Sequence, residues 1–93
     1  MNKTYLITYD LRKPGRDYAA LYRAIQSIAS GCARPLESIW IVRSNYSAIQ
    51  IRDQLNVHVD ADDQVLVIRL ANGDWGSLRV ANDANDWLSK NLA

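Results

Sequence analysis

The chain has 93 residues, of which 48% are hydrophobic and 23% are charged, and its 11 Lys and Arg residues nearly balance its 10 Asp and Glu residues. This length leaves room for a single domain, and the net charge of +1 argues against a strongly basic nucleic-acid coat or an acidic disordered tail. No apolar run reaches the roughly 18 residues of a membrane span. Because the first residues show no leader peptide and Cys32 is a lone thiol, we expect a cytoplasmic protein without membrane contact.

The first third of the chain predicts a strand followed by a helix. Residues 5–9 form a β-rich apolar run, which predicts the first strand. A basic, turn-forming stretch at residues 12–16 follows, and Asp17 is placed to cap a helix whose apolar residues recur with the period of an α-helix. We expect Gly31 to end this helix in the left-handed conformation that glycine adopts at low cost.

Two strands are predicted next, over residues 32–37 and 39–44, and they meet in a tight bend near Ser38. Pro35 lies in the first of them and cannot donate a hydrogen bond to a neighbouring strand, which indicates an edge strand. The second strand is apolar on both faces, which is typical of a strand in the middle of a sheet.

The second half of the chain predicts a helix, a strand and a terminal helix. Ser47 and Gln50 have the spacing of a capping box, so we expect a helix from this point to about Val57. Residues 64–70 predict the last strand, and residues 82–93 predict an amphipathic terminal helix.

This order of elements predicts an α+β protein with a ferredoxin-like fold, in which a β-α-β-β-α-β unit forms an antiparallel sheet and a C-terminal helix follows. We expect a single domain over residues 1–93, with its core in about residues 4–71 and a helical extension over about residues 82–93. The two inner helices of such a fold cover one face of the sheet.

The second face of this sheet needs a cover of its own. The last strand places Val65 and Val67 on one side and Leu66, Ile68 and Leu70 on the other, so both sides are apolar. A sheet covered on one face alone would instead alternate apolar and polar residues. We therefore expect the terminal helix to cover part of the second face, and a second copy of the chain to cover the rest in a homodimer through the open sheet face.

Asp10 is the first candidate for a chemical role, because it ends the apolar first strand. A carboxylate in that place is costly unless it is hydrated, paired or bound to a metal. A hard divalent ion such as Mg²⁺ prefers carboxylate and water ligands. The alternative is that Asp10 caps the following turn or pairs with Arg12 or Arg16.

A basic loop follows Asp10 directly and offers a place for phosphate. Arg12, Lys13 and Arg16 lie within it, and Arg34 is a further candidate for the same surface. Such a patch beside a metal is how a nuclease holds a nucleic-acid backbone. The alternative is an ordinary solvated loop.

Other motifs are excluded by what they lack. The acidic segment at residues 60–63 is not followed by the glycine and the glutamate of a calcium loop, so we interpret it as a turn. His58 is the single histidine, which argues against a zinc site.

Two short motifs resemble a known family. Tyr9-Asp10-Leu11, at the end of the first strand, resembles the Tyr-Asp-hydrophobic signature of the Cas-two family, the small CRISPR-associated endonuclease subunit. The segment that begins at Arg34 is similar to the Arg-x-Gln-x-Ser-Val-Phe segment of that family, and Ser38 matches its serine. As a whole, the chain resembles the SinR-like group of small bacterial proteins, which look like relatives of that subunit and of virulence-associated protein D, a ribonuclease toxin.

The resemblance implies a ferredoxin-like homodimer in which Asp10 of each protomer helps to hold a divalent metal between the chains, so that metal-bound water cleaves a phosphodiester. It also implies that Tyr9 and Ser38 line the site.

Two functions follow as hypotheses. One is a Mg²⁺-dependent endoribonuclease or endonuclease dimer of a toxin or defence system, acting on RNA or DNA. The other is a catalytically inactive dimer of the same fold that binds protein or nucleic acid.

Overall fold

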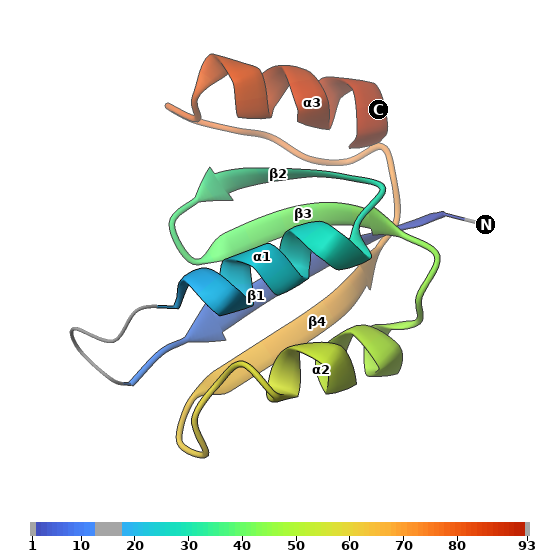
Figure 1. Cartoon of the computed structure of the whole chain (residues 1–93). Helices are drawn as coiled ribbons and strands as arrows, with labels where there is room; N and C mark the ends of the chain where they lie inside the picture. The colour runs from blue at the N-terminus through green and yellow to red at the C-terminus, as the bar shows by residue number, and fades with distance from the viewer. Residues whose placement is uncertain (1, 13–17, 93) are drawn as a thin grey trace.

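The computed structural model describes residues 2–12 and 18–92, and in these residues the elements follow the order β-α-β-β-α-β-α (Figure 1). Every predicted strand and helix is present, with small shifts at the ends, whereas the N-cap predicted at Asp17 lies outside the described residues. No helix in the described part of the chain is long and apolar enough to cross a membrane. The strands are β1 (Lys3–Asp10), β2 (Gly31–Leu36), β3 (Ile39–Ser44) and β4 (Gln64–Leu70), and the helices are α1 (Ala19–Ile28), α2 (Ala48–Asn56) and α3 (Asn82–Leu92).

The four strands form one open, antiparallel sheet in the order β2-β3-β1-β4. β1 pairs with both β3 and β4, so that Leu6 stands opposite Ile41 on one side and Ile68 on the other. β2 lies at an edge and β3 lies inside the sheet, as predicted, and the pairing of β2 with β3 changes register around Pro35. The described residues therefore form a mixed α+β structure.

Helices α1 and α2 cover one face of the sheet (Figure 1), and the main core lies between them and the strands. Alternate strand residues supply the sheet side of this core, with Tyr5 and Ile7 from β1 and Val42 from β3. The apolar stripe of each helix supplies the other side, because residues one turn apart share a helix face. The fully buried helix residues are Leu21, Ile25, Ile51 and Leu55.

Helix α3 covers only part of the second face. It lies beside β2 (Figure 1), and Leu88 and Leu92 pack against Ile41 of β3. The prediction that the terminal helix covers part of this face is thus confirmed. The face of β4 stays open, and Leu66 and Ile68 are 53% and 45% exposed there.

The role predicted for Gly31 is wrong. Among the described glycines the positive φ belongs to Gly73, at 111°, and Gly31 is the first residue of β2. A Cβ atom at Gly31 would lie 3.4 Å from Nε1 of Trp87, which is van der Waals contact with α3. Gly31 thus begins β2 beside α3 and does not end α1 in a left-handed conformation.

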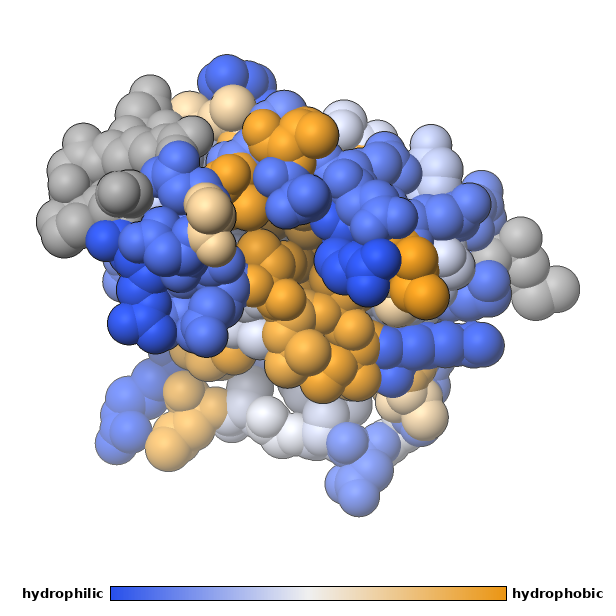
Figure 2. All heavy atoms as spheres, turned by 90° about the horizontal axis from the view of Figure 1, so that it is seen from below, coloured by the Kyte–Doolittle hydropathy of each residue, from blue (hydrophilic) through white to orange (hydrophobic). Residues whose placement is uncertain are grey.

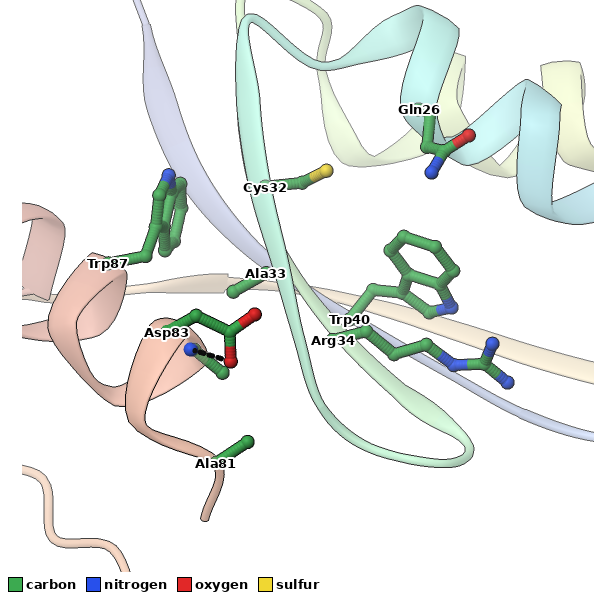
Figure 3. Close-up of a pocket in the computed structure, with 9 residues that line it drawn as sticks. Gln26, Cys32, Ala33, Arg34, Trp40, Ala81, Asp83 and Trp87 are labelled. Carbon is green, nitrogen blue, oxygen red and sulfur yellow. Dashed lines mark hydrogen bonds between the residues drawn. The ribbon is translucent and has the colours of Figure 1, made fainter.

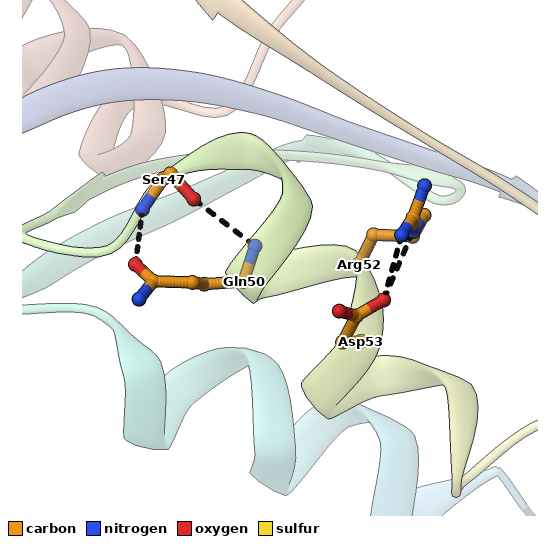
Figure 4. Close-up of polar contacts among 4 residues, drawn as sticks. All are labelled: Ser47, Gln50, Arg52 and Asp53. Carbon is orange, nitrogen blue, oxygen red and sulfur yellow. Dashed lines mark hydrogen bonds and ion pairs between the residues drawn. The ribbon is translucent and has the colours of Figure 1, made fainter.

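The capping box predicted for α2 is confirmed (Figure 4). Oγ of Ser47 accepts a hydrogen bond from the backbone N–H of Gln50 at 3.1 Å, and Oε1 of Gln50 accepts one from the backbone N–H of Ser47 at 2.8 Å. These two bonds satisfy backbone donors that the first turn of a helix leaves without partners.

Candidate functional site

A hollow of about 310 Å³ opens at the end of β1, beside the turn that joins β2 to β3. Tyr9, Asp10, Arg34 and Ser38, which were all predicted for the site, line this hollow. The two pairs are far apart in the sequence, and the sheet brings them together because Thr8 of β1 stands opposite Ile39, the first residue after the β2–β3 turn. We call this place the Asp10 hollow; its complete lining is Tyr9, Asp10, Leu11, Tyr22, Arg34, Glu37 and Ser38.

The hydroxyl of Tyr9 connects the parts of this hollow. It accepts hydrogen bonds from Nε1 of Trp40 at 3.1 Å and from Nη2 of Arg34 at 3.3 Å, and it donates to the backbone carbonyl of Glu37 at 3.2 Å. Burial raises the pKa of Tyr9, and the hydrogen bond from Trp40 and the charge of Arg34 offset only part of this rise. Tyr9 is therefore a neutral phenol that ties β1 to the β2–β3 turn.

Arg34 is held by aromatic rings as well as by hydrogen bonds. Its guanidinium carbon lies 4.5 Å from the centroid of the Tyr22 ring and 5.2 Å from that of Trp40. Its Nε and Nη2 donate to the backbone carbonyl of Glu37. Stacking on aromatic faces adds cation–π attraction and fixes the plane of the guanidinium. Within the described residues Nη1 makes no hydrogen bond, so this nitrogen is available to a ligand.

Asp10 is exposed at the end of β1 and forms an ion pair with Arg12, with 2.9 Å between Oδ2 and Nη2. This is the pairing that the sequence left open as an alternative. The side chains of Asp10 and Arg12 are 60% and 52% exposed, and an exposed ion pair is worth at most about 1 kcal/mol. The carboxylate therefore remains accessible to a competing cation. Lys13 and Arg16 of the predicted basic loop lie outside the described residues.

The acidic segment before β4 supports the start of the basic loop. Oδ1 of Asp63 accepts a hydrogen bond from the backbone N–H of Arg12 at 2.7 Å, and Oδ2 accepts one from the Tyr18 hydroxyl at 3.0 Å. Asp60, Asp62 and Asp63 hold carboxylate oxygens within 4.8 Å of one another, and they are the one such group of potential metal ligands in the described residues. The backbone N–H of Asp60 also donates to Oδ2 of Asp63. The carboxylate of Asp63 therefore stabilises the turn at residues 60–63.

Tyr22 and Trp40 support the site in a way that the sequence did not reveal. The apolar period of the first helix predicts Tyr22 in the core, and the apolar character of the strand at residues 39–44 predicts the same for Trp40. In the structure the Tyr22 ring lies 6.2 Å from the rings of both Tyr9 and Trp40. No spacing along the chain signals this contact, because it forms only when α1, β1 and β3 pack together.

A larger hollow of about 490 Å³ extends along β2 and is lined by residues of α1, β2, β3 and α3 (Figure 3). Trp40 and Arg34 border it on one side of β2, and Trp87 and Asp83 of α3 border it on the other. Of the predicted site residues only Arg34 belongs to it. Cys32 also lines this hollow, and burial raises the pKa of its thiol, which makes it a weak nucleophile at neutral pH.

The Asp10 hollow combines the carboxylates of Asp10 and Glu37 with the guanidinium of Arg34 and three hydroxyls, and Arg12 lies next to it as the ion-pair partner of Asp10. Carboxylate oxygens suit a hard cation, and guanidinium groups suit phosphate. The chemistry of the hollow therefore favours a ligand that brings phosphate and a divalent cation together.

The chain matches no known protein-family model.

Proposed function

We propose that this protein is a Cas-two-like homodimer with a ferredoxin-like fold, which binds the backbone of RNA or DNA at the Asp10 hollow and cleaves it with Mg²⁺. The main support is that residues from two separate motifs line this one hollow, namely Tyr9 and Asp10 from the first motif and Arg34 and Ser38 from the second. The resemblance to the Cas-two and SinR-like proteins suggests a cytoplasmic toxin or defence system as the setting.

The connections between the strands support the ferredoxin-like fold. β1 and β2 are joined through α1 and have β3 between them, and β3 and β4 are joined through α2 and have β1 between them. A split β-α-β unit has such a strand in its middle. α3 is an addition after this unit.

Two guanidinium groups are available for the phosphates. Arg34 is already held by stacking and by hydrogen bonds, so it loses little side-chain freedom when it binds. Arg12 exchanges an exposed ion pair with Asp10 for a phosphate, which costs about 1 kcal/mol or less. We propose Lys13 and Arg16 as further contacts, because phosphate contacts position a nucleic acid without selecting its sequence.

Asp10 is the residue that would hold Mg²⁺. This ion keeps several waters and binds proteins through one or two carboxylates together with substrate phosphates, so the exposed carboxylate of Asp10, with Glu37 in the same hollow, fits it. When bound, the ion supplies positive charge that stabilises the phosphate during cleavage. Ser38 offers its hydroxyl to the bound strand, and Tyr9 holds the turn that carries Ser38.

The open part of the sheet supports the homodimer. α3 leaves Leu66 and Ile68 of β4 exposed, and neighbouring apolar side chains on an open sheet are typical of an interaction surface. A second copy would remove this surface from water, and closed two-fold pairs are the most common soluble oligomers.

A nuclease assay with Asp10→Ala tests this function. We expect the wild type to cleave at least one of labelled single- or double-stranded RNA or DNA in Mg²⁺ or Mn²⁺. EDTA and Asp10→Ala should each abolish cleavage, because the metal loses its anchor. Asp53→Ala is the matched control, since Asp53 is 63% exposed and pairs with Arg52 at 2.9 Å on α2 (Figure 4). Full activity in Asp10→Ala would contradict the role of Asp10.

A second function is a dimer that binds nucleic acid or protein without cleaving it. The ion pair between Asp10 and Arg12 favours it, because it gives Asp10 a structural partner. Folded wild-type protein that cleaves none of the four substrates would support this function over the first. A gel-shift series against salt then separates the ligands: binding that weakens with salt indicates nucleic acid, and no shift at low salt indicates a protein partner.

A further inference from the structure

β4 is the outer strand of the sheet on the side away from α3 (Figure 1). It pairs with β1 without a register shift, from Gln64 opposite Asp10 to Leu70 opposite Thr4. Among the described residues no strand lies along its other edge, so the outward backbone N–H and C=O groups have no strand partner. An edge of this kind is a template for pairing with another chain.

The opposite edge of the sheet is protected. β2 contains Pro35, which has no N–H, and its pairing changes register there. Trp87 of α3 also lies against Gly31 at the start of β2. β4 has neither a proline nor a register shift, and Arg69 is its one charged residue. The two edges therefore differ in the features that prevent strand pairing.

The open sheet face has exposed apolar residues on β4 as well as on β2, where Leu36 is 54% exposed. Leu66 and Ile68 of β4 are exposed, whereas Leu6 and Thr8 of the neighbouring β1 are half-buried. Figure 2 views the molecule from the side on which β4 and α2 lie in Figure 1, and it shows hydrophobic atoms gathered in the middle of this side. A strand paired with the edge of β4 would place its own side chains beside Leu66 and Ile68 on this face.

We propose that a second copy of this chain pairs antiparallel with β4 along this edge, so that the two sheets join into one. The pairing rests on the homodimer of the proposed function and specifies how its two copies meet. β4 is self-complementary about Val67, because a two-fold axis at this residue sets Leu66 of each copy opposite Ile68 of the other. Apolar cross-strand pairs stabilise a sheet, and the new ladder satisfies the outward backbone groups.

The charges at this edge are also complementary. Within one copy, Arg69 stands opposite Tyr5 of β1. In the proposed register, Arg69 of one copy is also the diagonal neighbour of Asp63 of the second copy, on the same face of the sheet. Diagonal neighbours lie about 7–8 Å apart, a distance that an arginine side chain spans. Because Arg69 is the one charge within β4, no like charges oppose each other across the new ladder.

This arrangement separates the two Asp10 hollows. Asp10 stands opposite Gln64 of its own β4, and Gln64 stands opposite Leu70 of the second copy. With a rise of about 3.4 Å per residue and about 4.8 Å between strands, the two Asp10 Cα atoms are about 25 Å apart. One metal ion cannot join carboxylates at that distance. Each hollow would bind its own phosphate and metal, in contrast to the shared metal that the resemblance implies.

Disulfide cross-linking tests the register. In a Cys32→Ser background, the double variant Leu66→Cys/Ile68→Cys sets the new cysteines opposite each other, and we expect a covalent dimer on mild oxidation in a non-reducing gel. Leu66→Cys alone is the matched control. In this variant the cysteines at position 66 of the two chains are diagonal neighbours about 7–8 Å apart, which is too far for a disulfide. Equal cross-linking of the single and the double variant would contradict the register.

Light scattering at tens of micromolar separates the edge pairing from the homodimer itself. We expect twice the mass of the chain for the wild type and for the control Leu78→Lys, whose side chain is 75% exposed outside β4. Leu66→Lys should halve the mass, because a charge then lies in the apolar pair. A monomeric wild type would contradict both the homodimer and the pairing. A dimeric Leu66→Lys, with no cross-link in the double cysteine variant, would overturn the pairing alone.

Discussion

At the scale of single residues, Tyr9 shows how one hydroxyl holds a site together. It joins β1 to the indole of Trp40, to Arg34 and to the backbone of Glu37. Trp40 is 4% exposed, so its N–H group has little access to water when the Tyr9 hydroxyl is removed. A buried donor without a partner costs free energy, and the stability of the native state should therefore depend on this one oxygen.

We expect Tyr9→Phe to lower the free energy of unfolding by about 1–3 kcal/mol, because it leaves the Trp40 N–H unsatisfied. Urea denaturation followed by tryptophan fluorescence measures this change. Tyr46→Phe is the control, since Tyr46 is 42% exposed and its hydroxyl makes no hydrogen bond within the described residues. Tyr46→Phe should change the free energy of unfolding by no more than about 0.5 kcal/mol, as is usual for a surface substitution. Equal effects of the two variants would contradict the role of the Tyr9 hydroxyl.

The raised pKa of Tyr9 predicts a dependence of stability on pH. The folded state holds this proton more tightly than the unfolded state, where the pKa is about 10. The contribution is fully present below pH 10 and is lost as the pH rises through the higher pKa of the folded state. We therefore expect the stability difference between the wild type and Tyr9→Phe to shrink above about pH 10, in urea titrations from neutral to alkaline pH. A constant difference would exclude this linkage.

At the scale of elements, α2 begins at the position that the capping box in the sequence predicts. Ser47 and Gln50 satisfy each other's backbone N–H groups (Figure 4), and both partners lie within one turn of the chain. Such a start signal is readable from the sequence because it depends on neighbours three residues apart. α1 offers a contrast, since its N-cap residue Tyr18 makes no side-chain cap hydrogen bond.

We expect Ser47→Ala to destabilise the protein by about 0.5–2 kcal/mol, because the first turn of α2 loses its cap. Ser89→Ala is the matched control: Ser89 lies within α3, and its hydroxyl donates to the backbone carbonyl of Asn85 at 3.0 Å, a bond that adds little to a helix. Thermal unfolding of the three proteins measures both changes. A control that loses as much stability as Ser47→Ala would show that the cap is not the cause.

At the scale of the whole molecule, α3 decides which surface the protein offers to a partner. Leu88 and Leu92 bury the part of the second face at Ile41, and Trp87 packs on the start of β2. The face of β4 stays open. The stability of α3 depends on this packing, because a helix of its length is marginal in water when isolated.

We expect Leu88→Ala to cost about 2–5 kcal/mol, the usual cost of a cavity at a buried leucine, since Leu88 is 5% exposed. Hydrogen exchange should show the loss first in α3, while α1 and α2 keep the main core intact. Leu78→Ala, at a side chain that is 75% exposed, should change little. Uniform loss of protection over all three helices would indicate that α3 and the main core unfold as one unit.

Much of the fold could be read from local patterns. The order of the elements, the capping box at Ser47 and the edge position of β2 each follow from residues that are close in the chain, such as the proline that removes a donor from an edge. The apolar residues on both sides of the last strand also predicted that the second face needs a cover. Each of these signals involves residues only a few positions apart, so it can be recognised in the sequence without knowledge of the packing.

The sequence by itself therefore determined the elements of this protein, the strand that lies at an edge, and Asp10 as the end of β1. Only the tertiary structure decided that Tyr9, Arg34 and Trp40 meet, that Trp87 lies beside Gly31, and that Leu66 and Ile68 of β4 stay exposed. The physical reason is that these contacts join segments far apart in the chain. Their geometry depends on the order of the strands and on the side where α3 packs, and no local periodicity encodes either.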